Sequence, residues 1–388
     1  MKVISTEKVP IKMWLDDIEN GALEQAKNLA NLPFTFKHVA IMPDSHQGYG
    51  MPIGGVLATK GVVIPNAVGV DIGCGMSAVK TSITEVNIDQ LKVIMSKIRQ
   101  LIPVGFNKHK EKQELELMPP ISEAFGNYNI VDREFGNAMH QLGTLGGGNH
   151  FIEIQKDTNK HIWIMVHSGS RNLGKQVADH YNKIAINLNE RYFSSIPKEW
   201  GLAFLPMDTS EGQAYLAEMY YCIAFAFANR KLIMDRVMDC LREILPKFSV
   251  KDCFNIAHNY ANLETHFGQF VYIHRKGATL AEEGTIGIIP GSQGSHSYIV
   301  KGRGNKDSFN SCSHGAGRKM GRKEAERTLN LNNEIEDLNR RGILHAIRNV
   351  NDLDEAPGAY KDISIVMENQ KDLVDIVVEL TPLAVIKG

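Results

Sequence analysis

The sequence predicts an α+β protein in one large domain, because strand-like and helix-like segments are mixed without the regular alternation of a parallel sheet. No repeat and no linker-like tract interrupts the 388 residues, so we expect one domain over 1–388. Runs rich in β-branched and aromatic residues predict strands at 151–155, 162–166, 270–274 and 298–301. Helix-like segments occupy 176–191, 211–245 and 319–348.

The composition is that of an ordinary soluble globular protein, with 43% hydrophobic and 22% charged residues and a net charge of −1. These values exclude a disordered chain, a collagen-like chain and a disulfide-rich scaffold. The longest apolar stretch, 219–228, is shorter than the roughly 20 residues that a bilayer requires. Residues 1–10 carry no secretory pattern, so the five cysteines are expected to be reduced thiols. We expect a cytoplasmic protein with no membrane partner.

Glycine, histidine and proline gather in four clusters, at 42–75, 142–153, 166–175 and 276–321. Loops held on a regular scaffold are where catalytic and binding residues concentrate. Clusters so far apart in the chain indicate one site assembled from distant segments.

The first cluster contains Gly69-Val-Asp-Ile-Gly-Cys-Gly-Met76, in which Asp71 and Cys74 are three residues apart. The glycines let the backbone fold tightly enough for a carboxylate and a thiolate to face one metal ion. A thiolate can also bridge two metals. A buried cysteine beside a turn aspartate is the competing interpretation.

In the second cluster, three glycines precede Asn149 and His150, and Glu153 follows. The glycines allow a ligand to approach the backbone, and the three side chains offer an amide, an imidazole and a carboxylate. The alternative is a tight turn into the predicted strand, with His150 as a surface residue.

The third cluster, His167-Ser-Gly-Ser-Arg-Asn-Leu-Gly-Lys175, lies between a predicted strand and a predicted helix. This order suggests a phosphate site at a helix N-terminus, with Arg171 as a phosphate contact. Gln176 stands where a P-loop has Ser or Thr, which weakens that match. We expect neither a P-loop nor a Rossmann core.

Two further histidines are candidates for the site. His258 is a candidate third imidazole for a metal pair, although a lone histidine is more often a core or capping residue. His314 lies among small residues at the apparent start of a helix, in Ser313-His-Gly-Ala-Gly-Arg318. An accessible neutral imidazole can attack phosphorus, and a helix N-terminus with Arg318 favours an incoming phosphate. A structural role in the loop is the alternative.

The near-neutral total charge argues against a general nucleic-acid coat, but residues 271–330 differ from the rest. They hold ten Lys or Arg and five Asp or Glu, a local excess of +5. This excess indicates a surface that binds a polyanion.

These segments together resemble the RtcB family of RNA-splicing ligases. Further matching stretches are Met42-Pro-Asp-Ser-His-Gln-Gly-Tyr-Gly50, His258-Asn-Tyr-Ala261, His274-Arg-Lys-Gly-Ala278, Pro290-Gly-Ser292, Glu355-Ala-Pro-Gly-Ala-Tyr-Lys-Asp362 and Val385-Ile-Lys-Gly388. All occur in the family's order and cover nearly the whole chain. The resemblance implies a single domain with mixed β-sheets around a central active-site cleft.

The resemblance also implies the chemistry. The family joins an RNA 2′,3′-cyclic phosphate or 3′-phosphate end to a 5′-hydroxyl end, using GTP and two Mn²⁺ ions. By position, one Mn²⁺ would be held by Asp71, Cys74 and His150, and the other by Cys74, His167 and His258. His314 would be the nucleophile that becomes guanylylated, which activates the RNA 3′-phosphate for attack by the 5′-hydroxyl. No Lys-x-Asp-Gly motif of a lysine-adenylating ligase is present.

The remaining site residues are carried over in the same way. Arg171, Lys276 and Arg318 would hold RNA phosphates. The predicted GTP pocket comprises Asn149, His150, Phe151, Ile152, Glu153, His258, Asn259, Pro290, Gly291, Ser292, Gln293, Ser297, His314, Gly315, Ala316, Gly317, Tyr360 and Lys387.

Some features depart from the family pattern or leave alternatives open. Gln293 stands where many members have Met or another residue, and segments 108–137 and 193–209 match nothing in the pattern. These departures could mark a specialised paralogue that repairs cleaved RNA rather than one that joins tRNA halves. An archease-like activator is an expectation at the family level only. The alternative functions are a metal-dependent RNA phosphoesterase or nuclease without ligation, and a non-catalytic RNA-binding protein.

Overall fold

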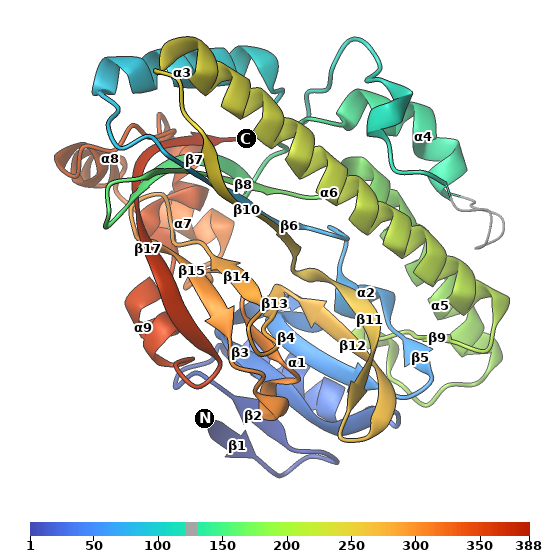
Figure 1. The fold of residues 1–388 in the computed structure, drawn as a ribbon. Helices are drawn as coiled ribbons and strands as arrows, with labels where there is room; N and C mark the ends of the chain where they lie inside the picture. The colour runs from blue at the N-terminus through green and yellow to red at the C-terminus, as the bar shows by residue number, and fades with distance from the viewer. Residues whose placement is uncertain (122–129) are drawn as a thin grey trace.

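The computed structural model describes residues 1–121 and 130–388, which build two large β-sheets (Figure 1). The first sheet has six strands, in the order β1 (Lys2–Ile4), β2 (Ile11–Met13), β3 (Thr35–Tyr49), β4 (Met51–Thr59), β12 (Gln269–Lys276) and β11 (Asn259–His266). The second has seven, in the order β10 (Val250–Ala257), β6 (Gly75–Thr81), β8 (Ile162–Ser168), β7 (Phe151–Asp157), β17 (Val374–Lys387), β15 (Ser297–Gly302) and β14 (Ile286–Ile289).

Two short strand pairs complete the β-structure of the described ranges: β5 (Val62–Val63) with β9 (Leu205–Pro206), and β13 (Ala278–Leu280) with β16 (Ser311–Ser313). Among the residues that the structure describes, every strand ladder is antiparallel except that of β2 with β3. Rossmann and P-loop cores need parallel strands joined by crossover helices, so the described chain contains neither. The predicted α+β class with several mixed sheets is confirmed.

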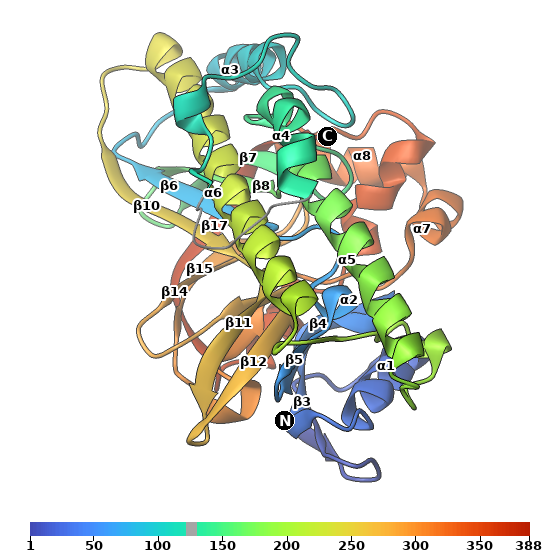
Figure 2. The ribbon, with the colours of Figure 1, turned by 90° about the vertical axis from the view of Figure 1, so that its right-hand side faces the viewer.

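The helices cover the two sheets. They are α1 (Asn20–Ala30), α2 (Pro65–Val68), α3 (Ile88–Leu101), α4 (Ile130–Gln141), α5 (Arg171–Arg191), α6 (Ser210–Ile244), α7 (Arg322–Thr328), α8 (Leu331–Arg340) and α9 (Ile363–Glu368). The longest, α6, starts where the Thr209 hydroxyl accepts the amide of Gly212. It buries an apolar face against β6, β8 and β10, with α3 and α5 beside it (Figures 1 and 2). Helix α1 packs on β3 and β4 of the other sheet.

Short 3₁₀ turns lie in the connections: η1 (Leu115–Leu117), η3 (Lys198–Trp200), η4 (Lys306–Ser308), η5 (Val350–Glu355) and η6 (Pro357–Ala359). The unmatched segment 108–137 contains η1 and most of α4, and its residues 122–129 lie outside the described residues. The unmatched segment 193–209 contains η3 and β9.

The predicted helices at 176–191 and 211–245 are confirmed, but α5 begins five residues earlier, at Arg171. The single helix predicted at 319–348 is wrong, since the structure has two short helices there, α7 and α8. The helix breaks because the side chain of Asn330 caps a new N-terminus by accepting the amide of Asn333. Gly342, with φ of 72°, then ends that second helix early.

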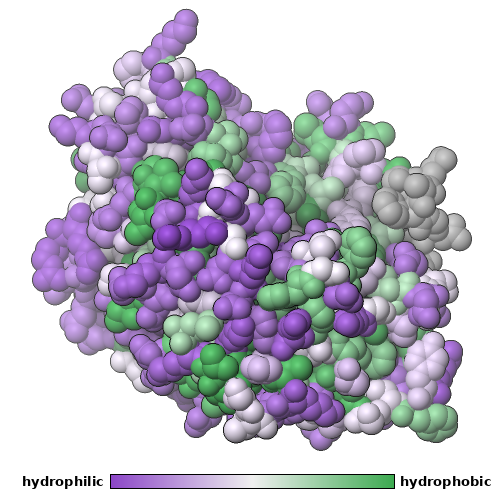
Figure 3. All heavy atoms as spheres, turned by 60° about the horizontal axis from the view of Figure 1, so that its bottom comes forward, coloured by the Kyte–Doolittle hydropathy of each residue, from purple (hydrophilic) through white to green (hydrophobic). Residues whose placement is uncertain are grey.

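The cysteines and the surface complete the description of the fold. All five cysteines are free, four of them buried and Cys253 exposed. Within the described residues no helix is both long and apolar enough to span a lipid bilayer. On the face shown in Figure 3, hydrophilic and hydrophobic side chains are interspersed.

Candidate active site

Strand register brings four distant segments to one end of the seven-stranded sheet. Gly75, the first residue of β6, pairs with Ala257 at the end of β10 and with Ser168 at the end of β8. The adjacent strand β7 starts at Phe151, which pairs with His167. Residues just outside these strand ends must therefore meet, although they are far apart in the sequence.

Cys74, His150 and His258 are those residues, and His167 lies between them on β8. The Cys74 Sγ atom lies 3.4 Å from His150 Nε2 and 3.2 Å from His167 Nε2. His167 Nε2 lies 3.4 Å from His258 Nε2, and His150 Nε2 lies 3.0 Å from Asp71 Oδ2. The structure thus brings all five predicted metal ligands into one group, of which the buried Cys74, His150 and His167 have ligand atoms within 4.8 Å of one another.

The ionisation of this group suits a cation. Burial holds the pKa of His167 and of His258 well below the usual range, so both imidazoles are neutral. His167 Nδ1 donates to the carbonyl of Asn149 at 3.0 Å, which leaves the Nε2 lone pair directed into the cluster. Burial and the neighbouring Asp71 raise the pKa of the Cys74 thiol, a cost that a bound divalent cation would offset. One thiol, three imidazoles and one carboxylate fit a divalent transition metal.

The predicted nucleophile is held by a carboxylate. Oδ2 of Asp44, on β3, accepts from His314 Nδ1 at 2.6 Å, and from the backbone amides of His314 at 3.1 Å and Gly315 at 3.2 Å. Burial would raise the pKa of Asp44, but the adjacent His314 lowers it, so the carboxylate is charged. An Nδ1–H bond of this kind leaves Nε2 of His314 available as a nucleophile.

His314 follows β16 directly, and α7 begins only at Arg322, so the prediction that His314 starts a helix is wrong. The pairing of Ala278 with Ser313 fixes this segment beside β13 instead. Two glycines make room around the site. A Cβ atom at Gly277 (φ 61°) would lie 3.0 Å from His314 Cε1, and one at Gly317 (φ 73°) would lie 2.1 Å from the Asp44 carbonyl oxygen.

The predicted nucleophile and the metal-ligand group are neighbours. The ring centroids of His258 and His314 are 4.8 Å apart. A phosphate bound at the metal ligands could therefore be reached by His314 without a change of fold.

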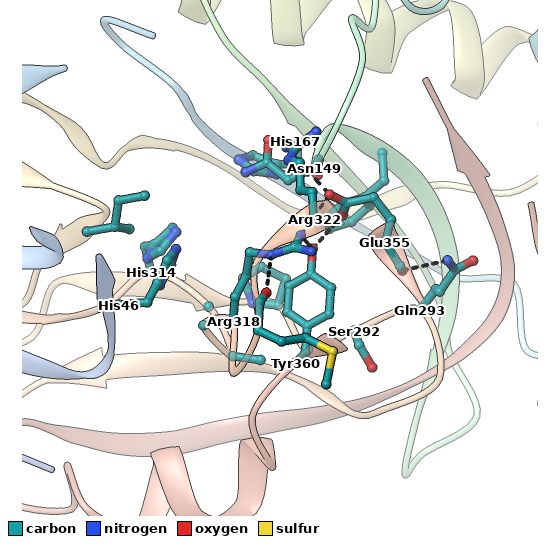
Figure 4. Close-up of a pocket in the computed structure, with 18 of the residues that line it drawn as sticks. His46, Asn149, His167, Ser292, Gln293, His314, Arg318, Arg322, Glu355 and Tyr360 are labelled. Carbon is teal, nitrogen blue, oxygen red and sulfur yellow. Dashed lines mark hydrogen bonds and ion pairs between the residues drawn. The ribbon is translucent and has the colours of Figure 1, made fainter. Parts of the chain in front are cut away.

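A cavity of about 640 Å³ opens in front of His314 (Figure 4). Most of the predicted GTP pocket lines it, namely Asn149, Phe151, Glu153, Pro290, Gly291, Ser292, Gln293, His314, Gly315, Ala316, Gly317, Tyr360 and Lys387. Five predicted pocket residues do not line it: His150, Ile152, His258, Asn259 and Ser297.

These five residues are not part of the cavity lining and have other contacts. His150 and His258 belong to the metal-ligand group, and Ile152 packs into an apolar core. The Ser297 hydroxyl accepts the amide of Gly291, and Asn259 donates to the carbonyl of Asp71. Ser297 thereby positions the wall residue Gly291, and Asn259 holds the backbone of Asp71 in the metal-ligand group.

The end of the cavity away from His314 is charged (Figure 4). The buried Glu355 carboxylate accepts from Arg318 at 3.0 Å, from Lys387 at 2.8 Å and from the Tyr360 hydroxyl. Burial would raise the pKa of Glu355, but Lys387, Tyr360 and Arg318 outweigh it and lower the pKa to about 2. Arg322 lies 3.5 Å from the same carboxylate.

Two oxygen atoms in the cavity wall have no hydrogen-bond partner within the described chain: Glu153 Oε1 and Gln293 Oε1. Burial raises the pKa of Glu153 to about 8, so this carboxyl is protonated at neutral pH. Gln293 Nε2 donates to the carbonyl of Glu355 at 2.8 Å, which aims the amide. A heterocycle that carries both N–H and carbonyl groups would satisfy these atoms.

The three predicted RNA contacts are placed differently from one another. Arg171 lies behind His150 and donates to the Thr144 hydroxyl at 3.2 Å. Lys276 is 8% exposed and donates to the carbonyls of Tyr49 and Asn66. Arg318 is paired with Glu355 at the charged end of the cavity.

Sequence reasoning assigned no role to Asp44, His46, Arg322 and Glu355, all of which lie in or against the cavity. Asp44 and His46 stand in the stretch 42–50, and Glu355 opens the stretch 355–362, so both stretches carried a signal. The missing information was the position of β3 in the fold, because this strand is buried continuously over residues 38–45 and its Asp44 lies against His314.

Comparisons with known proteins give one consistent result. A family model described as "tRNA-splicing ligase RtcB" matches residues 25–388. The RNA-splicing ligase RtcB of Escherichia coli K12 is 37% identical over 411 aligned positions, which cover 100% of this chain and 99% of that protein. The tRNA-splicing ligase RtcB of Thermococcus kodakarensis is 32% identical, with 98% and 95% covered.

Proposed function

The chain belongs to the RtcB family of RNA ligases, and from this premise we propose that it is a GTP- and Mn²⁺-dependent enzyme that joins RNA ends through guanylylated His314. The substrates would be an RNA end with a 2′,3′-cyclic phosphate or 3′-phosphate and an RNA end with a 5′-hydroxyl. The observation that carries the proposal is the position of His314, held by Asp44 between the metal-ligand group and a cavity of nucleotide size. We further propose that residues 1–388 act as a single catalytic domain.

The residues present fit two Mn²⁺ ions that share a thiolate. Asp71, Cys74 and His150 would hold one ion, and Cys74, His167 and His258 the other, with Cys74 as the bridge. Bound there, the ions would neutralise phosphate charge and align in-line displacement.

The GTP molecule would lie with its base toward Glu153, Gln293 and Lys387 and its phosphates toward His314. Glu153 and Gln293 supply the unpaired oxygens that a purine edge can meet. His314 Nε2 would attack the α-phosphorus, forming an N–P bond and releasing pyrophosphate. Asp44 would stabilise the positive charge that develops on the imidazole.

The guanylyl group would then pass from His314 to the RNA 3′-phosphate. This transfer turns a poor electrophile into one with a good leaving group, because GMP departs when the 5′-hydroxyl attacks. Arg171, which contacts His150, and Lys276 would hold RNA phosphates. Arg318 is already paired with Glu355, so its guanidinium would contribute less to phosphate binding. Either joining of tRNA halves or repair of cleaved RNA would use this chemistry.

The competing function is a metal-dependent RNA phosphoesterase or nuclease without ligation, which the metal-ligand group could support without His314. The experiment that separates the two is incubation with α-³²P-GTP and Mn²⁺, followed by denaturing electrophoresis. Label on the wild-type protein and none on the His314→Ala variant supports the ligase. Opening of cyclic phosphates by unlabelled wild-type protein supports the esterase.

A further inference from the structure

A second cavity of about 420 Å³ lies between the end of β3 and the chain that follows α5. Tyr49 and Asn66 form one side, and Asn182, Phe193 and Pro197 contribute to the other. The segment 193–209, which the sequence analysis could not place, thus has a role in shaping this cavity. Figure 2 shows the chain after α5 reaching the end of the molecule where α1 lies. Leu202 packs there in one core with Leu29 of α1.

The lining of this second cavity combines exposed aromatic rings with a side-chain amide oxygen that has no hydrogen-bond partner among the described residues. Tyr49 is 67% exposed and Phe193 is 93% exposed. Phe193 has φ of 51°, a left-handed conformation that is costly for a bulky residue. Asn182 Oδ1 is buried and has no hydrogen-bond partner within residues 1–121 and 130–388.

The charges at the rim cancel, because Lys198 pairs with Glu190 at 2.7 Å. The cavity is therefore neutral, aromatic and able to accept a hydrogen bond. These properties suit a flat heterocycle with N–H groups.

Strand β3 contributes residues to both the catalytic cavity and the second cavity. Gln47 and Gly48 line the catalytic cavity, whereas the next residue, Tyr49, lines the second. The Lys276 ammonium lies beside the second cavity, bonded to the carbonyls of two of its lining residues, Tyr49 at 2.7 Å and Asn66 at 3.0 Å. No carboxylate of the described residues pairs with this ammonium, and the next residue, Gly277, packs against His314.

We propose that the second cavity binds one unpaired nucleobase of the RNA substrate close to its reacting end, stacked against Tyr49 and Phe193. The proposal rests on the proposed function, since it takes RNA as the substrate. The Lys276 ammonium holds a neighbouring phosphate, and Asn182 Oδ1 accepts an N–H of the base. Proteins commonly recognise single-stranded RNA by stacking splayed bases on aromatic side chains in this way.

The test measures the binding of short single-stranded RNA with a 3′-phosphate by fluorescence anisotropy at fixed salt. One series carries an abasic site at each of the last three positions in turn. Wild-type protein should bind one of the abasic RNAs more weakly than the intact RNA by roughly 5- to 100-fold, the loss typical of one base–aromatic stack. Phe193→Ala should weaken the intact RNA similarly and should abolish the difference between the intact and that abasic RNA.

The control variant is Tyr192→Ala, because Tyr192 is a neighbouring aromatic residue, 52% exposed, that does not line the cavity. It should bind every RNA as the wild type does. Phe193 is almost fully exposed, and the denaturation midpoint of each variant checks its folding. The inference is overturned if Phe193→Ala binds intact RNA as tightly as wild type, or if the abasic penalty persists in that variant. GMP labelling is scored separately, so a chain that binds RNA through this cavity but never becomes guanylylated would refute only the proposed ligase chemistry.

Discussion

Oδ2 of Asp44 lies 2.6 Å from Nδ1 of His314, and the same oxygen accepts the backbone amides of His314 and Gly315. One buried carboxylate therefore sets the tautomer of the imidazole, its rotamer and the path of the loop that carries it. The contact joins residues 270 positions apart in the sequence. It holds His314, the predicted nucleophile, in place although this residue lies outside the helices of the described chain.

The first prediction concerns that carboxylate. Asp44→Asn should slow guanylylation of His314 by roughly 10²–10⁴-fold, because an amide neither fixes the Nδ1–H tautomer nor stabilises the imidazolium that forms. The measurement is the single-turnover rate of GMP-adduct formation at saturating GTP. Asp375→Asn is the matched control, since Asp375 is an exposed residue paired with Arg303. A variant within threefold of the wild-type rate would contradict the positioning role.

The second prediction concerns the metal ligands. Cys74→Ala should lose both Mn²⁺ ions, because its sulfur lies within reach of ligands of both predicted sites. Asp71→Asn and His258→Ala should each weaken only one of the two. Metal analysis after gel filtration gives the stoichiometry, and removal of metal with a chelator should abolish labelling of the wild type. Full metal content in Cys74→Ala would contradict the shared thiolate.

The third prediction concerns pH. The folded pKa of Glu153 is raised by burial from 4.5 to about 8, so the native state holds a proton that the unfolded state releases. The contribution of this group to the free energy of unfolding is fully present below pH 4.5 and is lost as the pH rises toward 8. The Glu153→Gln variant has no group that titrates here, so its stability should not fall in this way. The free energy of unfolding of the variant minus that of wild type should therefore rise with pH, by up to about 1.4 kcal/mol per pH unit. Urea titrations at several pH values test this, and a difference that does not vary with pH would contradict it.

The fourth prediction concerns the charged end of the cavity. Glu355→Gln should destabilise the protein by roughly 3 kcal/mol and weaken GTP binding, because Lys387 and Arg318 lose their buried counter-charge. Urea denaturation and GTP titration measure the two effects. Glu368→Gln removes an exposed ion pair with Lys371 and should change stability by less than about 1 kcal/mol. Equal stability of the two variants would be the contrary result.

The sequence was sufficient to predict which residues form the candidate metal-ligand group. Asp71, Cys74, His150, His167 and His258 stood in glycine-rich segments, and strand register brings them together. The class of fold was also predictable, since the mixed order of helices and strands excluded a parallel sheet. Local pattern could not predict the break at Asn330, because a capping hydrogen bond rather than hydrophobic periodicity decides it.

Residues that contact the site through another side chain could not be identified from the sequence. Asp44 meets His314 only because β3 lies against the loop that carries residue 314, and Glu355 meets Lys387 only because β17 returns to it. Such pairings depend on sheet order and on long-range contacts that no spacing rule encodes. The cavity beside Tyr49 was hidden for the same reason, since its two sides come from β3 and from the chain after α5.

The most direct measurement is mass spectrometry of the protein after incubation with GTP and Mn²⁺, with the modified residue mapped by proteolysis. The account predicts one GMP per chain, attached to His314 and absent from the His314→Ala variant. An unmodified His314 in a protein that still ligates RNA, or GMP on another residue, would contradict it.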